Sequence, residues 1–199
     1  MTSCYRARMQ YPLLVVALAA CASTSTPPRS PAYPLLDSRC DEYQALAHER
    51  HTIAPGMELF AFQDRDYVWL CYTTAAPNHA PMDMVVSAPA LAEPLDIHVS
   101  AQLGEWPANR EDLVPKDGAS ELWWNHQGWG ALTIPFNGLT ADGKVNWRQM
   151  PGREMQIAKA RFGRGSWKLR FKIYNVRFGE AEPTTIEFPK TGELELKVW

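Results

Sequence analysis

The chain has 199 residues, of which 46% are hydrophobic and 21% are charged, and its formal net charge is −2 at pH 7. This length suits one domain with a sizeable core, and the weak acidity argues against nucleic acid or an anionic surface as the partner. The composition stands out in one respect, which is its content of eight tryptophans.

The first residues predict an exported protein that carries a lipid anchor. Arg6 and Arg8 precede an apolar run over residues 11–20. A basic start followed by 7–15 apolar residues is typical of a secretory signal peptide, and a transmembrane helix would need about 20. The run ends in Leu-Ala-Ala-Cys at residues 18–21, which resembles the lipobox of bacterial lipoproteins. The resemblance implies that residues 1–20 are removed and that Cys21 is acylated.

Lipidation of Cys21 would tie the domain to a membrane, since several acyl chains anchor a protein that one chain holds only marginally. Ala22 follows the cysteine, whereas in many Gram-negative lipoproteins an aspartate there retains the protein in the inner membrane. The expected location is therefore the outer membrane, if the host is Gram-negative. Two alternatives stay open, namely an ordinary secretory signal cut near Ala20 or Ala22, and a cytoplasmic protein with an apolar start.

Residues 21–36 predict an extended tether, because they are rich in serine, threonine and proline and cannot bury enough apolar surface to fold. We expect one domain over residues 37–199. Cys40 and Cys71 remain in that domain after export, and an oxidising compartment predicts a disulfide between them. The bond would stabilise the fold by roughly 3–4 kcal/mol in the chain-entropy model. The alternative is a pair of buried thiols.

Residues 37–51 predict the one helix, capped by Asp37 or Ser38, and the disulfide would pin this helix to the strand that contains Cys71. After residue 56 the pattern changes to short β segments. Residues 57–62 and 67–73 flank a polar turn, which predicts a hairpin.

Further strands are predicted at residues 82–87, 96–102, 119–124, 131–136, 155–160, 166–176, 184–188 and 193–198. Many of them alternate between apolar and polar residues. In the segment 166–176 we expect inward-facing Trp167, Leu169, Phe171 and Ile173, with Lys168, Arg170 and Lys172 facing water. About ten short strands predict a mainly β fold, an antiparallel β-sandwich with one short N-terminal helix, or a related barrel.

Signatures of catalysis are missing from the sequence, which contains no G-x-S-x-G elbow, P-loop or dinucleotide fingerprint. Two pairs, His48 with His51 and Asp96 with His98, could each contribute to a metal site, but neither has a third ligand in view, so we predict no metal and no cofactor. Carboxylates are plentiful, and any two could form an acid/base pair in space. The sequence nominates no such pair, so an enzyme is not the preferred interpretation.

Tryptophans between residues 106 and 129 provide the candidate ligand site. Flat aromatic faces beside amide and imidazole groups suit a neutral sugar ring, whose C–H face stacks on an indole while its hydroxyls meet polar side chains. We predict that a carbohydrate or another small polar ligand binds at Trp106, Trp123, Trp124, His126 and Trp129. The alternative is that these tryptophans anchor the core and the loops of the sandwich.

The order of the strands adds a family resemblance over residues 56–180. The segments that carry it are 66–72 (DYVWLCY), 82–86 (MDMVV), 95–101 (LDIHVSA), 154–158 (EMQIA) and 165–171 (GSWKLRF). In this order they resemble carbohydrate-binding module family 9 and DOMON-like β-sandwiches. The resemblance implies a domain that binds sugar or senses haem. A haem would take Met82 or Met84 with His98 as its axial pair.

Each of three candidate functions predicts a different surface feature in the structure. A non-enzymatic glycan-binding module predicts exposed tryptophans along a groove. An accessory subunit of an envelope protein complex predicts a flat apolar patch without a groove. An envelope hydrolase predicts a cleft with two convergent carboxylates or histidines, at least one of them with a perturbed pKa. The first two are preferred over the third.

Overall fold

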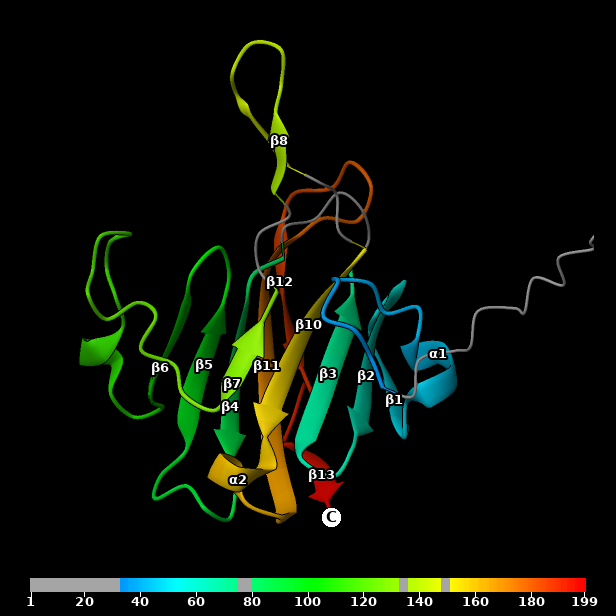
Figure 1. The fold of residues 1–199 in the computed structure, drawn as a ribbon, viewed down its shortest axis with the longest axis vertical. Coiled ribbons are helices and arrows are strands. Elements are labelled where there is room, and N and C mark those ends of the chain that lie inside the picture. Colours follow the sequence, from blue (N-terminus) through cyan, green and yellow to red (C-terminus); the bar gives the residue numbers. More distant parts are fainter. Residues whose placement is uncertain (1–32, 75–79, 133–135, 148–150) are drawn as a thin grey trace, which may run out of the picture.

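The computed structural model describes residues 33–199, apart from 75–79, 133–135 and 148–150. Two antiparallel β-sheets pack face to face around the core (Figure 1). The predicted antiparallel β-sandwich with a short N-terminal helix is thereby confirmed. The described part of the chain contains no helix of the length and apolar character that crossing a membrane requires.

The first sheet has five strands in the order β1-β2-β3-β10-β7. The bounds are Glu49–Ala54 for β1, Met57–Gln63 for β2, Tyr67–Thr73 for β3, Gly152–Ala158 for β10 and Trp129–Ala131 for β7. The predicted hairpin of the second and third strands is confirmed by their antiparallel pairing.

The second sheet has six strands, five of them in the order β12-β11-β4-β5-β6, while β13 pairs with the first half of β11. The bounds are Thr184–Phe188 for β12, Gly165–Val176 for β11, Met82–Ser87 for β4, Leu95–Val99 for β5, Leu103–Pro107 for β6 and Leu194–Val198 for β13. A separate hairpin of β8 (Phe136–Leu139) and β9 (Val145–Trp147) projects beyond one end of the sheets (Figure 1).

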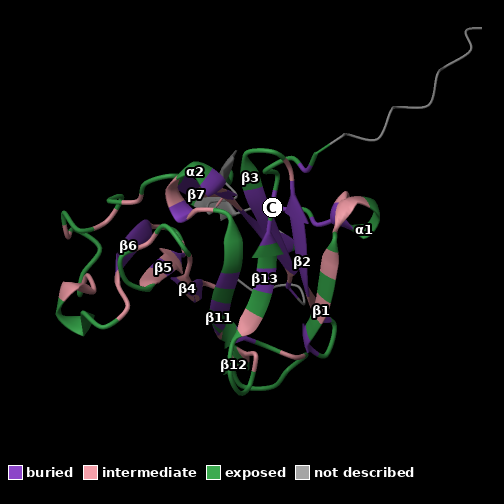
Figure 2. Cartoon of the chain, turned by 90° about the horizontal axis from the view of Figure 1, so that it is seen from below, coloured by how far each residue is buried: buried purple, intermediate pink, exposed green. Residues whose placement is uncertain are grey.

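Strand β11 shows why the second sheet has one buried and one exposed face. Its residues alternate between exposed and buried along most of its length (Figure 2). The predicted inward-facing residues are all buried, namely Trp167, Leu169, Phe171 and Ile173. The basic residues between them are exposed, so the outer face of this sheet presents polar side chains to solvent. The predicted alternation is confirmed.

The first sheet is instead covered on both faces, and β2 and β3 are buried along nearly their whole length. The chain before β1 packs on the outer face, where Tyr43 of α1 (Tyr43–Leu46) contacts a second apolar cluster with Phe60 and Trp69. The predicted disulfide between Cys40 and Cys71 is confirmed and joins this segment to β3.

The predicted helix over residues 37–51 is wrong in extent, since α1 spans a single turn and β1 already begins at Glu49. The His48 amide donates to the Ala61 carbonyl at 2.8 Å, and from there the chain pairs with β2. Gly56, with φ of 71°, closes the turn between the two strands. His48 and His51 therefore do not share a helix face.

Strand predictions near the tryptophans also need correction. The strand predicted at residues 119–124 is wrong, because residues 121–124 form a turn, and neither β6 nor β7 was predicted with correct bounds. The cause is local turn chemistry, because the Ala119 amide donates to the Asp117 carboxylate and the Leu122 amide to the Ser120 hydroxyl. The expected strand at 131–136 includes residues 133–135, which lie outside the described part of the chain. The expected strand at 155–160 ends at Ala158, where the one-turn helix α2 (Lys159–Phe162) begins.

Candidate functional site

Polar side chains cross the outer face of the second sheet in a row set by strand register. Lys172 of β11 lies opposite Asp83 of β4, and Asp83 lies opposite His98 of β5. Their inward-facing neighbours fill the core, so alternation directs all three to the outer face. Glu187 of β12 pairs with Lys172 and extends the row on the other side.

A second row runs beside the first, two residues along each strand. Arg170 lies opposite Val85, Val85 opposite Asp96, and Asp96 opposite Trp106 of β6. Directly opposed and diagonal side chains on one sheet face lie within reach of each other. The two rows together place Asp83 and Asp96 as diagonal neighbours on the same surface.

Both carboxylate oxygens of Asp83 have a polar partner on this surface. Its Oδ1 lies 2.6 Å from His98 Nδ1, and its Oδ2 accepts a hydrogen bond from the Tyr174 hydroxyl at 2.5 Å. Burial and the negative charge of Asp83 raise the pKa of Tyr174. The phenol therefore stays protonated and keeps donating to Asp83, which fixes the carboxylate between a histidine and a tyrosine.

Asp96 differs from Asp83 because part of it lacks a partner. Its Oδ1 is buried and accepts no hydrogen bond among the described residues. The pKa of Asp96 is raised to about 6, first by burial and second by the nearby charge of Asp83. A hydrogen bond with Trp106, followed by the charges of His98 and Lys172, opposes this increase. Asp96 is thus a carboxylate that changes protonation near neutral pH.

An aromatic cluster packs against the histidine end of the surface. The ring centroids of Trp106 and Trp123 lie 6.2 and 5.2 Å from that of His98. Gly104 leaves room for this packing, since a Cβ there would lie 3.0 Å from Trp106 and 3.2 Å from Trp123. The Trp123 indole nitrogen donates to the Asp117 carbonyl at 2.8 Å, so the loop that ends in Trp123 is held over β6.

A groove of about 430 Å³ opens over the two rows. Its volume falls in the range of small-molecule sites, although its lining is more polar than usual. The lining residues come from four strands, a short 3-10 helix (Glu111–Leu113) and one loop: Asp83, Val85, Asp96, Glu111, Arg170, Phe171, Lys172, Tyr174, Glu187 and residues 189–192. By contrast, the cavity between the sheets beside Leu59 and Phe171 measures about 10 Å³, which is room for about one water molecule.

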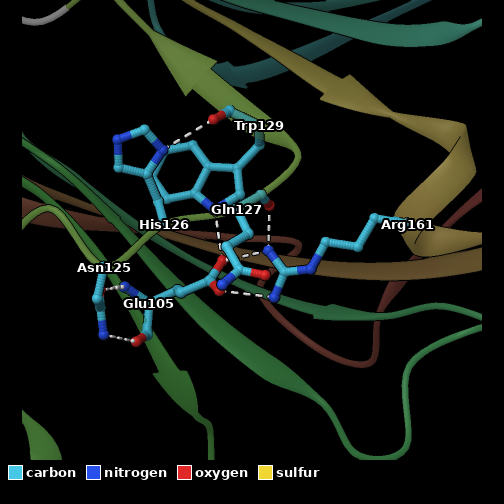
Figure 3. A network of polar contacts seen from close by, with 6 residues as sticks. All are labelled: Glu105, Asn125, His126, Gln127, Trp129 and Arg161. Carbon is cyan, nitrogen blue, oxygen red and sulfur yellow. Dashed lines mark hydrogen bonds and ion pairs between the residues drawn. The ribbon is translucent and has the colours of Figure 1, made fainter.

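Two other predicted ligand residues, Trp129 and His126, belong to a different network on the opposite side of β6 (Figure 3). The buried Trp129 indole donates to Glu105 at 2.6 Å, and Arg161 binds both oxygens of that carboxylate at 2.6 Å. His126 Nδ1 lies 2.9 Å from the Trp129 carbonyl oxygen. This network joins β6, β7 and α2, and its buried side chains serve the structure of the sandwich edge.

The five predicted ligand residues therefore do not converge. Trp106 and Trp123 lie beside His98, next to the groove but not among its lining residues. Trp124 is 55% exposed, and its backbone has φ of 66°. Asp83, Arg170 and Tyr174 were not predicted as site residues, and the sequence feature that could have indicated them is their outward alternation on β4 and β11. Strand alternation alone could not show that these residues meet.

The groove matches none of the three hypotheses in full. Polar residues rather than exposed tryptophans line it, and a groove is present where an accessory subunit would present a flat apolar patch. Two neighbouring carboxylates, one with a raised pKa, match the feature expected of a hydrolase. The haem pair is wrong, because Met82 and Met84 are buried in the core while His98 lies on the outer face. Within the described residues, no group of three histidine, cysteine or acidic side chains could hold a metal.

A scan against protein-family models found no match to this chain, and searches of the curated proteins and of the solved structures also found none. The resemblance to carbohydrate-binding module family 9 and DOMON-like domains stays a prediction from the order of the strands.

Proposed function

We propose that this protein is a membrane-anchored envelope lipoprotein whose domain binds a small polar ligand, a glycan, in the groove on the outer face of the second sheet. The observation that supports this most strongly is the meeting of Asp83, Asp96 and Tyr174 at one groove. The fold itself does not require polar side chains at these positions, because solvent-facing strand residues are broadly replaceable. Their gathering over a groove of ligand size favours recognition.

The chemistry of a glycan fits the groove. Carboxylates such as Asp96 accept hydrogen bonds from sugar hydroxyls, and the exposed Arg170 and Lys172 donate to hydroxyl and ring oxygens. Val85 offers an apolar contact between them. Trp106 and Trp123 contribute indirectly, by packing against His98 and holding the Asp83 side of the surface in place.

The anchor rests on the lipobox at residues 18–21 and on Cys21. The disulfide of Cys40 and Cys71 supports export, since such bonds persist in oxidising compartments. If the host is Gram-negative, the proposed location of the domain is the outer membrane. Intact mass of the membrane-extracted protein tests this proposal. We expect a chain that begins at residue 21 with added acyl mass, and loss of that mass in Cys21→Ser. A chain cut elsewhere without acyl mass would refute it.

Binding is tested by titration calorimetry of the purified domain against a panel of envelope and plant glycans. Asp83→Asn keeps the size of the side chain but removes a charged acceptor, so affinity should fall at least about tenfold. Lys168→Ala is the matched control, because Lys168 is exposed on the same face of β11, outside the groove, and pairs with Glu193. The proposal fails if no glycan binds, or if the two variants lose affinity equally.

One observation favours glycan hydrolysis as a second candidate. Asp96, with a pKa of about 6, lies beside Asp83, and a protonated acid next to a carboxylate is the pairing that glycosidases use. Under this candidate the protein should release reducing ends from a bound glycan. Asp96→Asn should then abolish turnover of a neutral glycan while its binding persists. Binding without any turnover across pH 5–8 would exclude the candidate.

A further inference from the structure

We propose that the groove selects a zwitterionic ligand, whose ammonium group binds at Asp96 and whose carboxylate binds at Arg170, across the floor formed by Val85. This inference rests on the proposed function and names the ligand class of the same groove. An amino sugar that carries an acid group has this chemistry, and so does a free amino acid.

The first support is the presence of unpaired charges of both signs. The groove contains four acids and three bases: Asp83, Asp96, Glu111, Glu187, Arg170, Lys172 and Lys190. Within the described part of the chain, the one salt bridge that any of them makes is that of Asp83 with His98. Lys172 otherwise lies over the Tyr174 ring, with 5.4 Å between its Nζ and the ring centroid.

The second support is the spacing of the charges. Arg170 and Asp96 face each other across Val85, on strands that are two positions apart. Neighbouring strands lie about 4.8 Å apart, so the two backbones are separated by about 10 Å. Arg170 and Asp96 therefore flank a gap above Val85 that is at most two strand spacings wide. An ammonium and a carboxylate separated by a few bonds span such a gap, while the carbon atoms between them contact the valine.

The third support is the state of Asp96 itself. Its buried Oδ1 has no donor within the described residues, and a buried acceptor without a donor is costly. A ligand ammonium bound at Asp96 supplies a positive charge beside this carboxylate, which offsets the cost of its ionisation. The acids and bases of the groove nearly balance, so a ligand with one charge of each sign leaves the balance intact. A purely anionic or purely cationic ligand would instead disturb it.

Four related sugars separate these contributions. N-acetylglucosamine is neutral, glucosamine carries the ammonium, N-acetylmuramic acid carries the carboxylate, and muramic acid carries both. Alanine provides the same two charges without a sugar ring. In calorimetry at pH 7.5 we expect muramic acid to bind at least about tenfold more tightly than either singly charged sugar.

Two substitutions test the assignment of each charge. Asp96→Asn should lower the affinity for muramic acid to that for N-acetylmuramic acid, and it should leave the affinity for N-acetylmuramic acid unchanged. Arg170→Gln should lower the affinity for muramic acid to that for glucosamine, and it should leave the affinity for glucosamine unchanged. Thermal unfolding of each variant shows that the fold is retained, and the ligand-specific pattern distinguishes lost recognition from a general loss of structure.

The outcomes separate this inference from the proposed function. If N-acetylglucosamine binds as tightly as muramic acid, glycan binding stands and the zwitterion inference fails. If alanine binds and no sugar does, the charge assignment stands and the glycan function fails. If none of the five probes binds, or if both substitutions weaken every probe equally, the inference is overturned.

Discussion

Replacing Asp96 by asparagine should stabilise the protein at neutral pH. The pKa of this carboxyl rises from 3.8 to about 6 on folding, mainly because the group is buried. Between these values the folded state holds the proton more tightly than the unfolded chain. Stability is therefore lost as the pH rises through this window, and below about pH 4 the cost disappears.

The magnitude follows from the size of the change in pKa. At 1.36 kcal/mol per pKa unit, ionised Asp96 costs at most about 3 kcal/mol above pH 6. The side chain is partly exposed, and screening by solvent reduces this cost to about 1–2 kcal/mol. Asparagine has the same shape, can still accept a hydrogen bond from Trp106 and carries no charge. The free energy of unfolding should therefore rise by about 1–2 kcal/mol at pH 7.5 and remain unchanged near pH 4.

Urea unfolding followed by tryptophan fluorescence measures both proteins at the two pH values. Glu154, whose pKa burial also raises to about 7, is present in both chains, so its contribution cancels in the difference. Asp83, His98 and Lys172 are the charged groups nearest to Asp96 and are likewise unchanged. A stabilisation of equal size at both pH values, or destabilisation at pH 7.5, would refute the reasoning.

Three further predictions concern the frame of the site. Cys71→Ser should cost roughly 3–4 kcal/mol of unfolding free energy in urea, and a wild type that is equally stable in reductant would contradict this. Gly104→Ala should displace Trp106 and Trp123, which would shift tryptophan fluorescence and weaken ligand binding. Gly130→Ala is the control, because a Cβ there meets nothing within 4 Å, and it should change neither property. Glu105→Gln should cost about 2–4 kcal/mol by breaking a largely buried pair with its arginine, and a thermal unfolding curve that does not move would count against that role.

Much of the fold could be predicted from local patterns in the sequence. Alternation in residues 166–176 correctly assigned the buried face of β11, because side-chain direction in a strand has a period of two residues. The β2–β3 hairpin was predictable from its polar turn, in which the Asp64 carboxylate accepts the amides of Asp66 and Tyr67. The disulfide was predicted from the two cysteines that would remain after the expected signal peptide and Cys21 are set aside. Each of these inferences needs information from one short segment or from composition.

The site depends on information that local patterns lack. Lys172 and Asp83 are distant in sequence, and no local pattern states that β11 pairs with β4 in the register that places them together. The burial of two tryptophans was unpredictable for a related reason. Trp106 and Trp129 have the composition of a ligand site, yet each became buried once β6 and β7 formed. The helix at 37–51 failed because pairing of β1 with β2 outweighed a weak local propensity.

The energetics of Asp96 connect the fold to the function. Asp96 opposes folding, because its carboxylate is partly buried beside a second carboxylate and one of its oxygens has no hydrogen-bond donor among the described residues. A neutral residue at that strand position would pair with Val85 without this cost. Strain of this kind persists in proteins mainly where it serves a site. If the zwitterion inference holds, a bound ammonium removes this cost, so ligand should stabilise the wild type more than Asp96→Asn at pH 7.5. Unfolding with and without muramic acid measures that difference, and equal stabilisation of both proteins would mean that Asp96 is costly for another reason.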